Sequence, residues 1–275
     1  MSLRGLRLAT QFLTRLPVPG VTDFSAADLS RSAVWFPLVG VVVGALVAVT
    51  ITLTARYGAF LSAVLAVLVW VGLTGALHLD GLADLADALG ASHRDPQRFL
   101  TVLADPHVGT FGAVTIVLAL LVKTAALATL HPALAHPGAL TQAGALTHGW
   151  SMMYGLPIAG LPLITAVPLI AAWARLGPLA WSRWLPPLKA GQGERFALSL
   201  QSGWIVAWTI LLFAASAWVT PVLCIAPLAL LGWGLWLKLR VGGVTGDCLG
   251  AGVEVVEIVL LLVVVGGETR LFFLV

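Results

Sequence analysis

Long apolar stretches, separated by short polar segments, dominate the pattern of this chain. Six of them are candidates for helices that cross a lipid bilayer, which needs about 20 apolar residues; five have about that length, and the last is short. A helix satisfies its own backbone hydrogen bonds in lipid, so each stretch is predicted to be a membrane helix. The six stretches are 33–54, 59–77, 111–130, 203–220, 222–239 and 253–265.

A further apolar region, 139–176, does not divide cleanly because Pro157, Pro162 and Pro168 interrupt it. It could hold one kinked span, two spans or a re-entrant segment, since neighbouring helices can satisfy the carbonyls that a proline frees. With no evident internal repeat, we expect residues 1–275 to form a single membrane-embedded catalytic domain. The predicted fold is all-α, a polytopic integral membrane protein with about six to eight transmembrane helices.

The composition agrees with a membrane protein. Hydrophobic residues make up 59% of the chain and charged residues only 10%, whereas soluble domains carry about 25% charged residues. The formal net charge of +3 is too small to indicate a nucleic-acid partner, so the lipid bilayer is the expected environment. The two cysteines, Cys224 and Cys248, have no spacing typical of a zinc site or a disulfide framework.

The basic residues suggest an orientation, because Lys and Arg concentrate in cytoplasmic loops. They gather in the N-terminal segment, in 175–195 and just before 241. If 139–176 crosses the membrane an odd number of times, these segments and the acidic loops all face the cytoplasm at the cell inner membrane. The basic residues concerned are Arg4, Arg7, Arg15, Arg31, Arg175, Arg183, Lys189, Arg195, Lys238 and Arg240.

An acidic cluster follows the second apolar stretch. Asp80, Asp84 and Asp87 are spaced i, i+4 and i+7, which stacks three carboxylates on one helical face. A solvated acidic face is the alternative, but it would normally interleave Lys or Arg, and none occurs from Asp80 to Gly90. Oxygen ligands suit Mg²⁺ or Mn²⁺, with Gly81 allowing a close backbone approach or a turn and Gly90 ending the helix.

A second acidic cluster lies in the Gly-rich segment 242–257. Gly243, Thr245 and Gly246 belong to a loop whose amides could approach phosphate oxygens. Two carboxylates at the head of a membrane span are costly without a partner, which favours a functional role over simple complementation of the helix N-terminus. The acids of this cluster are Asp247, Glu254 and Glu257.

Other polar residues are weaker candidates. Asp105 and His107 precede a long apolar helix, where they could form an ordinary cap or add a metal or base position. Arg15, Arg183 and Lys189 should lie on the acidic face, where they could bind phosphate or simply anchor the loops. Three remaining histidines lie far from the acids in this scheme and are not expected to be ligands: His131, His136 and His148.

Clustered acids at one membrane face, without a nucleophilic Ser or Cys motif, indicate metal-assisted phosphoryl or nucleotidyl transfer. A CDP-alcohol phosphotransferase uses similar aspartates, but the Ala-Arg pair that follows Asp-Gly in that class is missing here. An ion-coupled transporter would place its acids near the bilayer midplane and show an inverted repeat. Both alternatives stay open at this point.

Several motifs carry a resemblance to a known family. The chain resembles the cobalamin synthase family, adenosylcobinamide-GDP ribazoletransferase, over most of its length. It departs from the family pattern at Ala104 and His107, where the family usually has basic residues. The matching segments are Gln11–Pro19, Phe36–Gly40, Thr74–Gly90, Val108–Gly112 and Gly242–Glu257.

The resemblance implies a Mg²⁺-dependent membrane enzyme whose partners are adenosylcobinamide-GDP and α-ribazole or its 5′-phosphate, with a homo-oligomer left open. It implies attack on the phosphorus attached to cobinamide and release of GMP. The expected metal ligands are Asp80, Asp84, Asp87, Asp247, Glu254 and Glu257. The expected catalytic residues are Asp80, Asp84, Asp105, Asp247 and Glu257. The expected substrate-binding residues are Arg15, His78, Gly81, His107, Arg183, Lys189, Gly243, Thr245 and Gly246.

Overall fold

The computed structural model describes residues 2–92, 95–130, 165–189 and 202–273. Within these ranges the chain is helical, and pairing of extended chain is limited to one isolated bridge between Pro187 and Val244. The helices are α1 (Leu3–Leu13), α2 (Ala26–Ser32), α3 (Phe36–Thr54), α4 (Ala59–Thr74), α5 (Leu77–Ser92), α6 (Pro96–Val102), α7 (Thr110–Leu130), α10 (Ala166–Trp184), α12 (Ser202–Val219), α13 (Ala226–Arg240) and α14 (Gly246–Phe273). Short 3₁₀ turns occupy Ala33–Trp35, Ala55–Tyr57 and Pro221–Ile225.

The predicted all-α membrane fold is confirmed. Five helical stretches are long and apolar enough to cross a membrane, and α4 with α5 would make a sixth if that bent pair is one span. The five stretches are Ala26–Tyr57, Thr110–Leu130, Ser202–Val219, Pro221–Arg240 and Gly246–Gly267. Each coincides with an apolar run of the sequence, although the last begins seven residues earlier than the run at 253–265 predicted.

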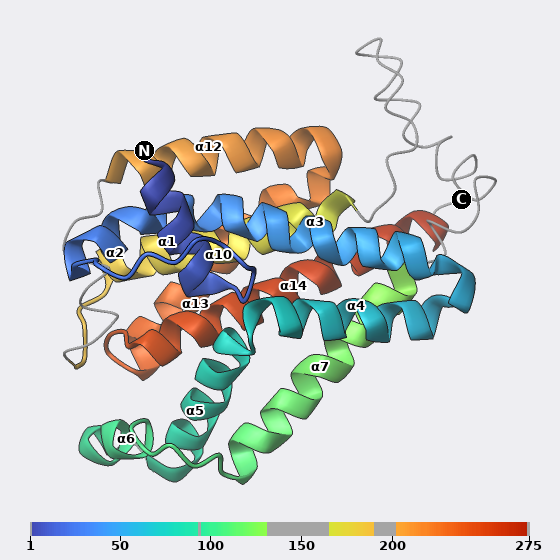
Figure 1. Cartoon of the computed structure of the whole chain (residues 1–275). Helices are drawn as coiled ribbons and strands as arrows, with labels where there is room; N and C mark the ends of the chain where they lie inside the picture. The colour runs from blue at the N-terminus through green and yellow to red at the C-terminus, as the bar shows by residue number, and fades with distance from the viewer. Residues whose placement is uncertain (1, 93–94, 131–164, 190–201, 274–275) are drawn as a thin grey trace.

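The core of the bundle is built around α10. Nearly all its side chains are buried, and it packs most extensively on α3, with α14 on another side (Figure 1). Small residues allow the close approach to α3, because a Cβ on Gly40 or Gly44 would collide with the α10 backbone. The prediction that 175–195 is a cytoplasmic loop is therefore wrong for its first ten residues, which continue α10 through the core.

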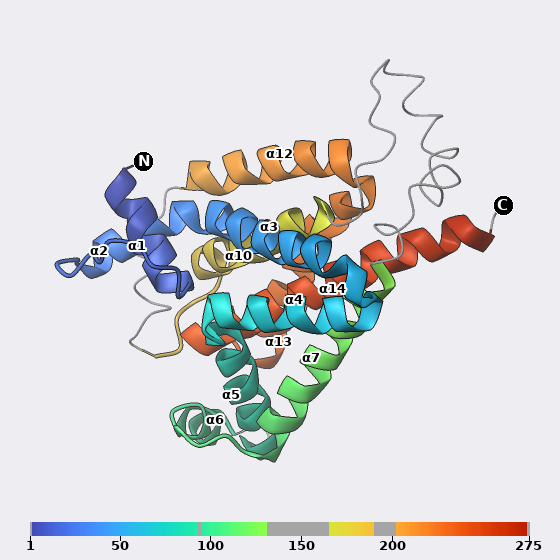
Figure 2. The same ribbon diagram turned by 45° about the vertical axis from the view of Figure 1, so that its right-hand side comes forward.

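A sharp bend separates α4 from α5. Gly75 and Ala76 both have positive φ, and α5 turns away from α4 by 88°. Glycine adopts this left-handed conformation readily, whereas alanine does so at a cost. As a result α5, α6 and the start of α7 project from one side of the bundle, which Figure 2 shows most clearly.

The ends of several helices meet where α5 leaves the bundle. The start of α14, the start of α3 and the C-terminal ends of α1, α4 and α10 all lie at this end (Figures 1 and 2). The two acidic motifs, which are more than 150 residues apart in the sequence, therefore come together here.

Candidate active site

Close packing of α5 against α14 brings the two acidic motifs together. A Cβ placed on Gly81 would lie 2.8 Å from the carbonyl oxygen of Asp247 and 3.0 Å from its Cα. Only a residue without a side chain fits at this distance. Gly81 was expected to approach a ligand or make a turn; instead it lies within α5 and admits the first turn of α14.

A hollow of about 330 Å³ opens at this contact. Asp80 and Asp247 contribute carboxylates to its wall, Lys189 contributes an ammonium group, and His78 contributes an imidazole. Apolar side chains from α1, α3, α5, α10 and α14 also line it: Phe12, Leu13, Phe36, Leu77, Pro178, Leu249 and Val253. The hollow thus combines an apolar wall with a few convergent charged groups, as small-molecule sites usually do.

Pairing between two loops brings Lys189 to this hollow. Val244 donates its N–H to the carbonyl of Pro186 (2.9 Å), and Leu188 donates to the carbonyl of Val244 (3.0 Å). A Cβ on Gly243 would collide with the Pro186 carbonyl, so this glycine serves the loop pairing. The Lys189 Nζ consequently lies 3.7 Å from the Asp247 carboxylate.

The first turn of α14 is fixed by Thr245. Its hydroxyl accepts the N–H of Cys248 (3.3 Å) and lies 3.3 Å from the Asp247 carboxylate. A threonine that accepts from the third residue of a helix caps its N-terminus. Gly246 lines the hollow directly, so the Gly-rich segment shapes the wall that carries Asp247.

Asp84 lies one turn beyond Asp80 on α5, outside the five helices that could each cross a membrane. Partial burial raises its pKa to about 6, and the negative charges of Asp80, Asp247 and Asp87 add to the effect. Lys189 opposes the shift but does not cancel it. The carboxylates of the two motifs thus act on one another electrostatically, as the sequence pattern predicted.

His78 is buried, and its Nδ1 has no hydrogen-bond partner among the described residues. Burial lowers its pKa well below the usual 6.5, and the positive charges of Arg175 and Lys123 lower it further. The imidazole is therefore neutral at physiological pH. A buried polar atom without a partner is costly, and in the wall of a hollow a bound molecule can supply that partner.

Asp87, expected to be a metal ligand, serves a different contact. Its two carboxylate oxygens accept the N–H groups of Gly109 (2.8 Å) and Gly112 (2.9 Å) at the start of α7. A carboxylate is well placed at a helix N-terminus, where the free amides and the helix dipole favour negative charge. Asp87 therefore fastens α5 to α7, and each of its oxygens already accepts one backbone N–H.

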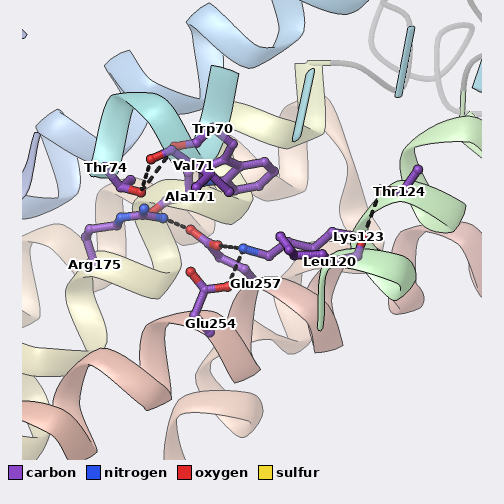
Figure 3. Close-up of polar contacts among 10 residues, drawn as sticks. All are labelled: Trp70, Val71, Thr74, Leu120, Lys123, Thr124, Ala171, Arg175, Glu254 and Glu257. Carbon is purple, nitrogen blue, oxygen red and sulfur yellow. Dashed lines mark hydrogen bonds and ion pairs between the residues drawn. The ribbon is translucent and has the colours of Figure 1, made fainter. Parts of the chain in front are cut away.

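Glu254 and Glu257 lie deep in α14, two to three turns beyond Gly246, rather than at the head of the span. Lys123 on α7 contacts both carboxylates at 2.5 Å, and Arg175 on α10 pairs with Glu257 (Figure 3). All four side chains are buried. Two cations balance two anions, so this buried cluster, which we call the charge cluster, satisfies its own charges without a metal.

Lys123 was not among the residues predicted to be functional, and Arg175 was expected to anchor a loop. A signal for Lys123 was present, because a lysine in the middle of an apolar span requires a partner. The Lys123 ammonium also lies 4.6 Å from the centre of the Trp70 ring on α4, which adds a cation–π contact. The charge cluster thus connects α4, α7, α10 and α14.

The remaining candidates do not line the hollow. Arg15 packs on Gly75 at the α4–α5 bend, and Arg183 lies within 3.4 Å of the Ser202 hydroxyl. Asp105 and His107 are exposed in the loop before α7 and hydrogen-bond to each other, which lowers the pKa of Asp105. His131, His136, His148, Arg195 and the segment 191–193 lie outside the described residues, as do Pro157 and Pro162.

The carboxylates that line the hollow, together with Asp84 one helical turn from Asp80, fit Mg²⁺ better than a metal that needs a full protein cage. Within the described ranges, no three His, Cys, Asp or Glu side chains lie close enough together to hold an ion by themselves. Mg²⁺ is usually held by one or two carboxylates, waters and substrate phosphates. Asp80 and Asp84, which repel each other across one helical turn, offer that kind of partial site.

Comparisons with known proteins show the family of this chain. The family model described as cobalamin-5-phosphate synthase matches residues 5–265. A protein of Thiobacillus denitrificans, named adenosylcobinamide-GDP ribazoletransferase, is 47% identical over 94% of both chains. Proteins of the same name from Novosphingobium aromaticivorans (45% identical; 94% of this chain and 95% of the relative) and Laribacter hongkongensis (47%; 96% and 97%) are similar over nearly their full lengths. No solved structure matches the chain.

The family match covers all but the first few and the last few described residues, and the three relatives align with 94–96% of this chain. Both acidic motifs that meet at the hollow fall within the matched residues. This chain belongs to the cobalamin-5-phosphate synthase family.

Proposed function

We propose that this protein transfers the adenosylcobinamide-phosphate group of adenosylcobinamide-GDP to a free ribose hydroxyl of α-ribazole or α-ribazole 5′-phosphate. The products are GMP and adenosylcobalamin or its 5′-phosphate. Family membership and the names of the relatives support the reaction. The observation that carries the site is the meeting of Asp80, Asp247 and Lys189 at one hollow, although they come from separate parts of the sequence.

The chemistry is a displacement at phosphorus. A ribose hydroxyl oxygen of ribazole forms a bond to the phosphorus attached to cobinamide, and the bond from that phosphorus to the oxygen of GMP breaks. This hydroxyl is one that the 5′-phosphate leaves free; it loses its proton, and GMP leaves with the bridging oxygen. A site for this reaction must hold a diphosphate, accept a proton and exclude water.

Residues that line the hollow can perform each of these tasks. Lys189 binds a diphosphate oxygen as a point charge, and Asp247 accepts the proton of the attacking hydroxyl. His78, neutral and without a partner, forms a hydrogen bond to the substrate through Nδ1. The apolar lining from α1, α3 and α10 keeps bulk water from the reacting phosphorus.

Mg²⁺ is the proposed cofactor, and Asp80 and Asp84 are the residues that would hold it. When bound, Mg²⁺ neutralises diphosphate charge and polarises the phosphoryl oxygens. Asp87, Glu254 and Glu257 are left out of this ligand set because groups of the chain itself occupy their oxygens.

The distribution of cations supports an inner-membrane protein whose hollow faces the cytoplasm. Lys and Arg concentrate on the cytoplasmic side of membrane proteins. At the opposite end of the bundle Arg56 lies in the turn between α3 and α4, and Arg270 lies near the end of α14. The hollow end carries many more: Arg4, Arg7, Arg15, Arg31, Arg183, Lys189, Lys238 and Arg240.

The proposal is tested with purified protein in liposomes supplied with adenosylcobinamide-GDP, α-ribazole and Mg²⁺, with GMP release measured over time. Asp80→Asn and Asp247→Asn should each reduce turnover about 100-fold or more, as loss of a metal ligand or general base does. Asp23→Asn, the same change at an exposed residue away from the hollow, is the matched control. Near wild-type turnover in the folded Asp80 and Asp247 variants would refute the site.

A second assay distinguishes the proposed reaction from the reaction of a lipid-directed CDP-alcohol phosphotransferase. The same liposomes receive CDP-diacylglycerol with glycerol 3-phosphate in place of the corrinoid substrate. We expect no CMP release. CMP release without GMP release in the first arm would replace the proposed reaction with the lipid-directed one.

A further inference from the structure

An apolar groove of about 380 Å³ runs along the outer side of α13 and α14, away from the hollow. Its lining comes from Ala229, Gly232, Trp233 and Trp236 on α13 and from Val255, Val256 and Val259 on α14. The volume lies within the range of about 300–1,000 Å³ typical of small-molecule sites. Both helices are long and apolar enough to cross a membrane, so the groove lies at the depth of the lipid acyl chains.

The groove is built on one face of α13 and kept open by a glycine. The lining positions 229, 232, 233 and 236 recur at helical spacing. A Cβ on Gly232 would meet no atom within 4 Å, so the space above this residue is open. Trp233 and Trp236 stack with ring centroids 4.8 Å apart and form a rigid aromatic wall.

A positively charged side chain lies at one end of this face of α13. Arg240 follows Trp236 by four residues, on the same face of α13, and is exposed. No ion pair of Arg240 occurs among the residues that the structure describes. Lys238 lies nearby, 6.0 Å from the ring of Trp184, and adds positive charge at the same end.

The positive charge at the end of the groove indicates that its ligand carries a negative charge. We propose that the groove binds one anionic glycerophospholipid, with an acyl chain along Trp233 and Trp236 and the phosphate at Arg240. An Arg guanidinium binds phosphate through paired hydrogen bonds, and cations next to a membrane span attract anionic lipids. An acyl chain fills an apolar groove without leaving any polar group unpaired.

A residue of the groove also contacts the first turn of α14, which carries Asp247 of the hollow. The Trp233 indole N–H donates to the carbonyl of Cys248 (3.3 Å), the residue that follows Asp247. A lipid seated against Trp233 therefore packs against the tryptophan that holds the first turn of α14.

Lipid binding is measured directly, without reference to turnover. The purified protein is delipidated in detergent and titrated with phosphatidylglycerol or phosphatidylcholine of the same chain length, and bound lipid is counted by native mass spectrometry. We expect one phosphatidylglycerol to bind about 10-fold more tightly than phosphatidylcholine. Arg240→Gln should remove most of this preference, while Arg56→Gln at the opposite end should keep it.

A second variant tests the groove itself. Gly232→Leu fills the open space without a backbone clash and should abolish binding of that lipid, while Gly203→Leu, at another unobstructed helical glycine, should not. Equal affinity for the two lipids, or full binding by the folded Gly232→Leu variant, would overturn the proposal. A stable dimer that Gly232→Leu disrupts would also overturn it, because the occupant would then be a second copy of the chain.

Discussion

Gly81 and Asp247 are in contact: the backbone of Asp247 occupies the space that a side chain at position 81 would need. This contact joins α5 to α14, and so joins the two acidic motifs. A change at Gly81 alters the distance between Asp80 and Asp247 without altering any charge.

Gly81→Ala should therefore reduce turnover although it removes no functional group. The added Cβ must push α5 from α14, because a backbone carbonyl at 2.8 Å cannot rotate away as a flexible side chain can. Overpacking of this kind costs about 1–3 kcal/mol, and we expect at least a 10-fold loss of kcat. Gly72→Ala, at a helical glycine with nothing within 4 Å, is the control. Equal activity of the two variants would show that the contact does not set the site geometry.

Asp84→Asn should stabilise the protein without Mg²⁺ at pH 7. The folded-state pKa of Asp84, about 6, lies above the ordinary aspartate value of 3.8, so the folded protein binds more protons than the unfolded chain between these values. The charged carboxylate thus destabilises the fold above pH 6, and this penalty disappears as the pH falls toward 4. Asparagine removes the penalty at every pH.

The measurement is the melting temperature in detergent with EDTA, between pH 4.5 and 7.5. Wild type should gain stability on acidification relative to the variant, and Mg²⁺ should raise the melting temperature of wild type at pH 7 far more than that of Asp84→Asn. An equal Mg²⁺ response in the two proteins would remove Asp84 from the metal site.

Asp87 should behave as a structural residue. Asp87→Ala leaves the amides of Gly109 and Gly112 without their acceptor at the start of α7. Loss of a buried, charge-assisted cap costs about 1–3 kcal/mol, so the melting temperature should fall by several degrees. The affinity for Mg²⁺, read from metal-dependent stabilisation, should stay within about 2-fold of wild type. A variant with normal stability but weakened Mg²⁺ binding would restore Asp87 to the ligand set.

The sequence predicted the membrane helices well because a bilayer imposes a length and an apolarity that can be read residue by residue. It also placed Asp80 and Asp247 on one face of the membrane, and the structure brings their motifs to one hollow. It could not predict the partners of Asp87 and Glu257, because carboxylates three or four residues apart on a helix have the same spacing whether they bind a metal, backbone N–H groups or a cation of another helix. Arg175 was misplaced for a related reason: its positive charge resembles a loop anchor until its partner is known.

Lys123→Met should destabilise the protein more than any change at the hollow. Removing the ammonium leaves Glu254 and Glu257 buried with Arg175 as the remaining cation of the charge cluster, and breaking a buried pair in this way costs about 3–5 kcal/mol. Adding Glu254→Gln restores a one-to-one balance between Glu257 and Arg175, so the double variant should recover much of the lost melting temperature. Glu254→Gln alone serves as the reference for a double-mutant cycle. A double variant no more stable than Lys123→Met would show that Lys123 acts through packing on Trp70 rather than through charge.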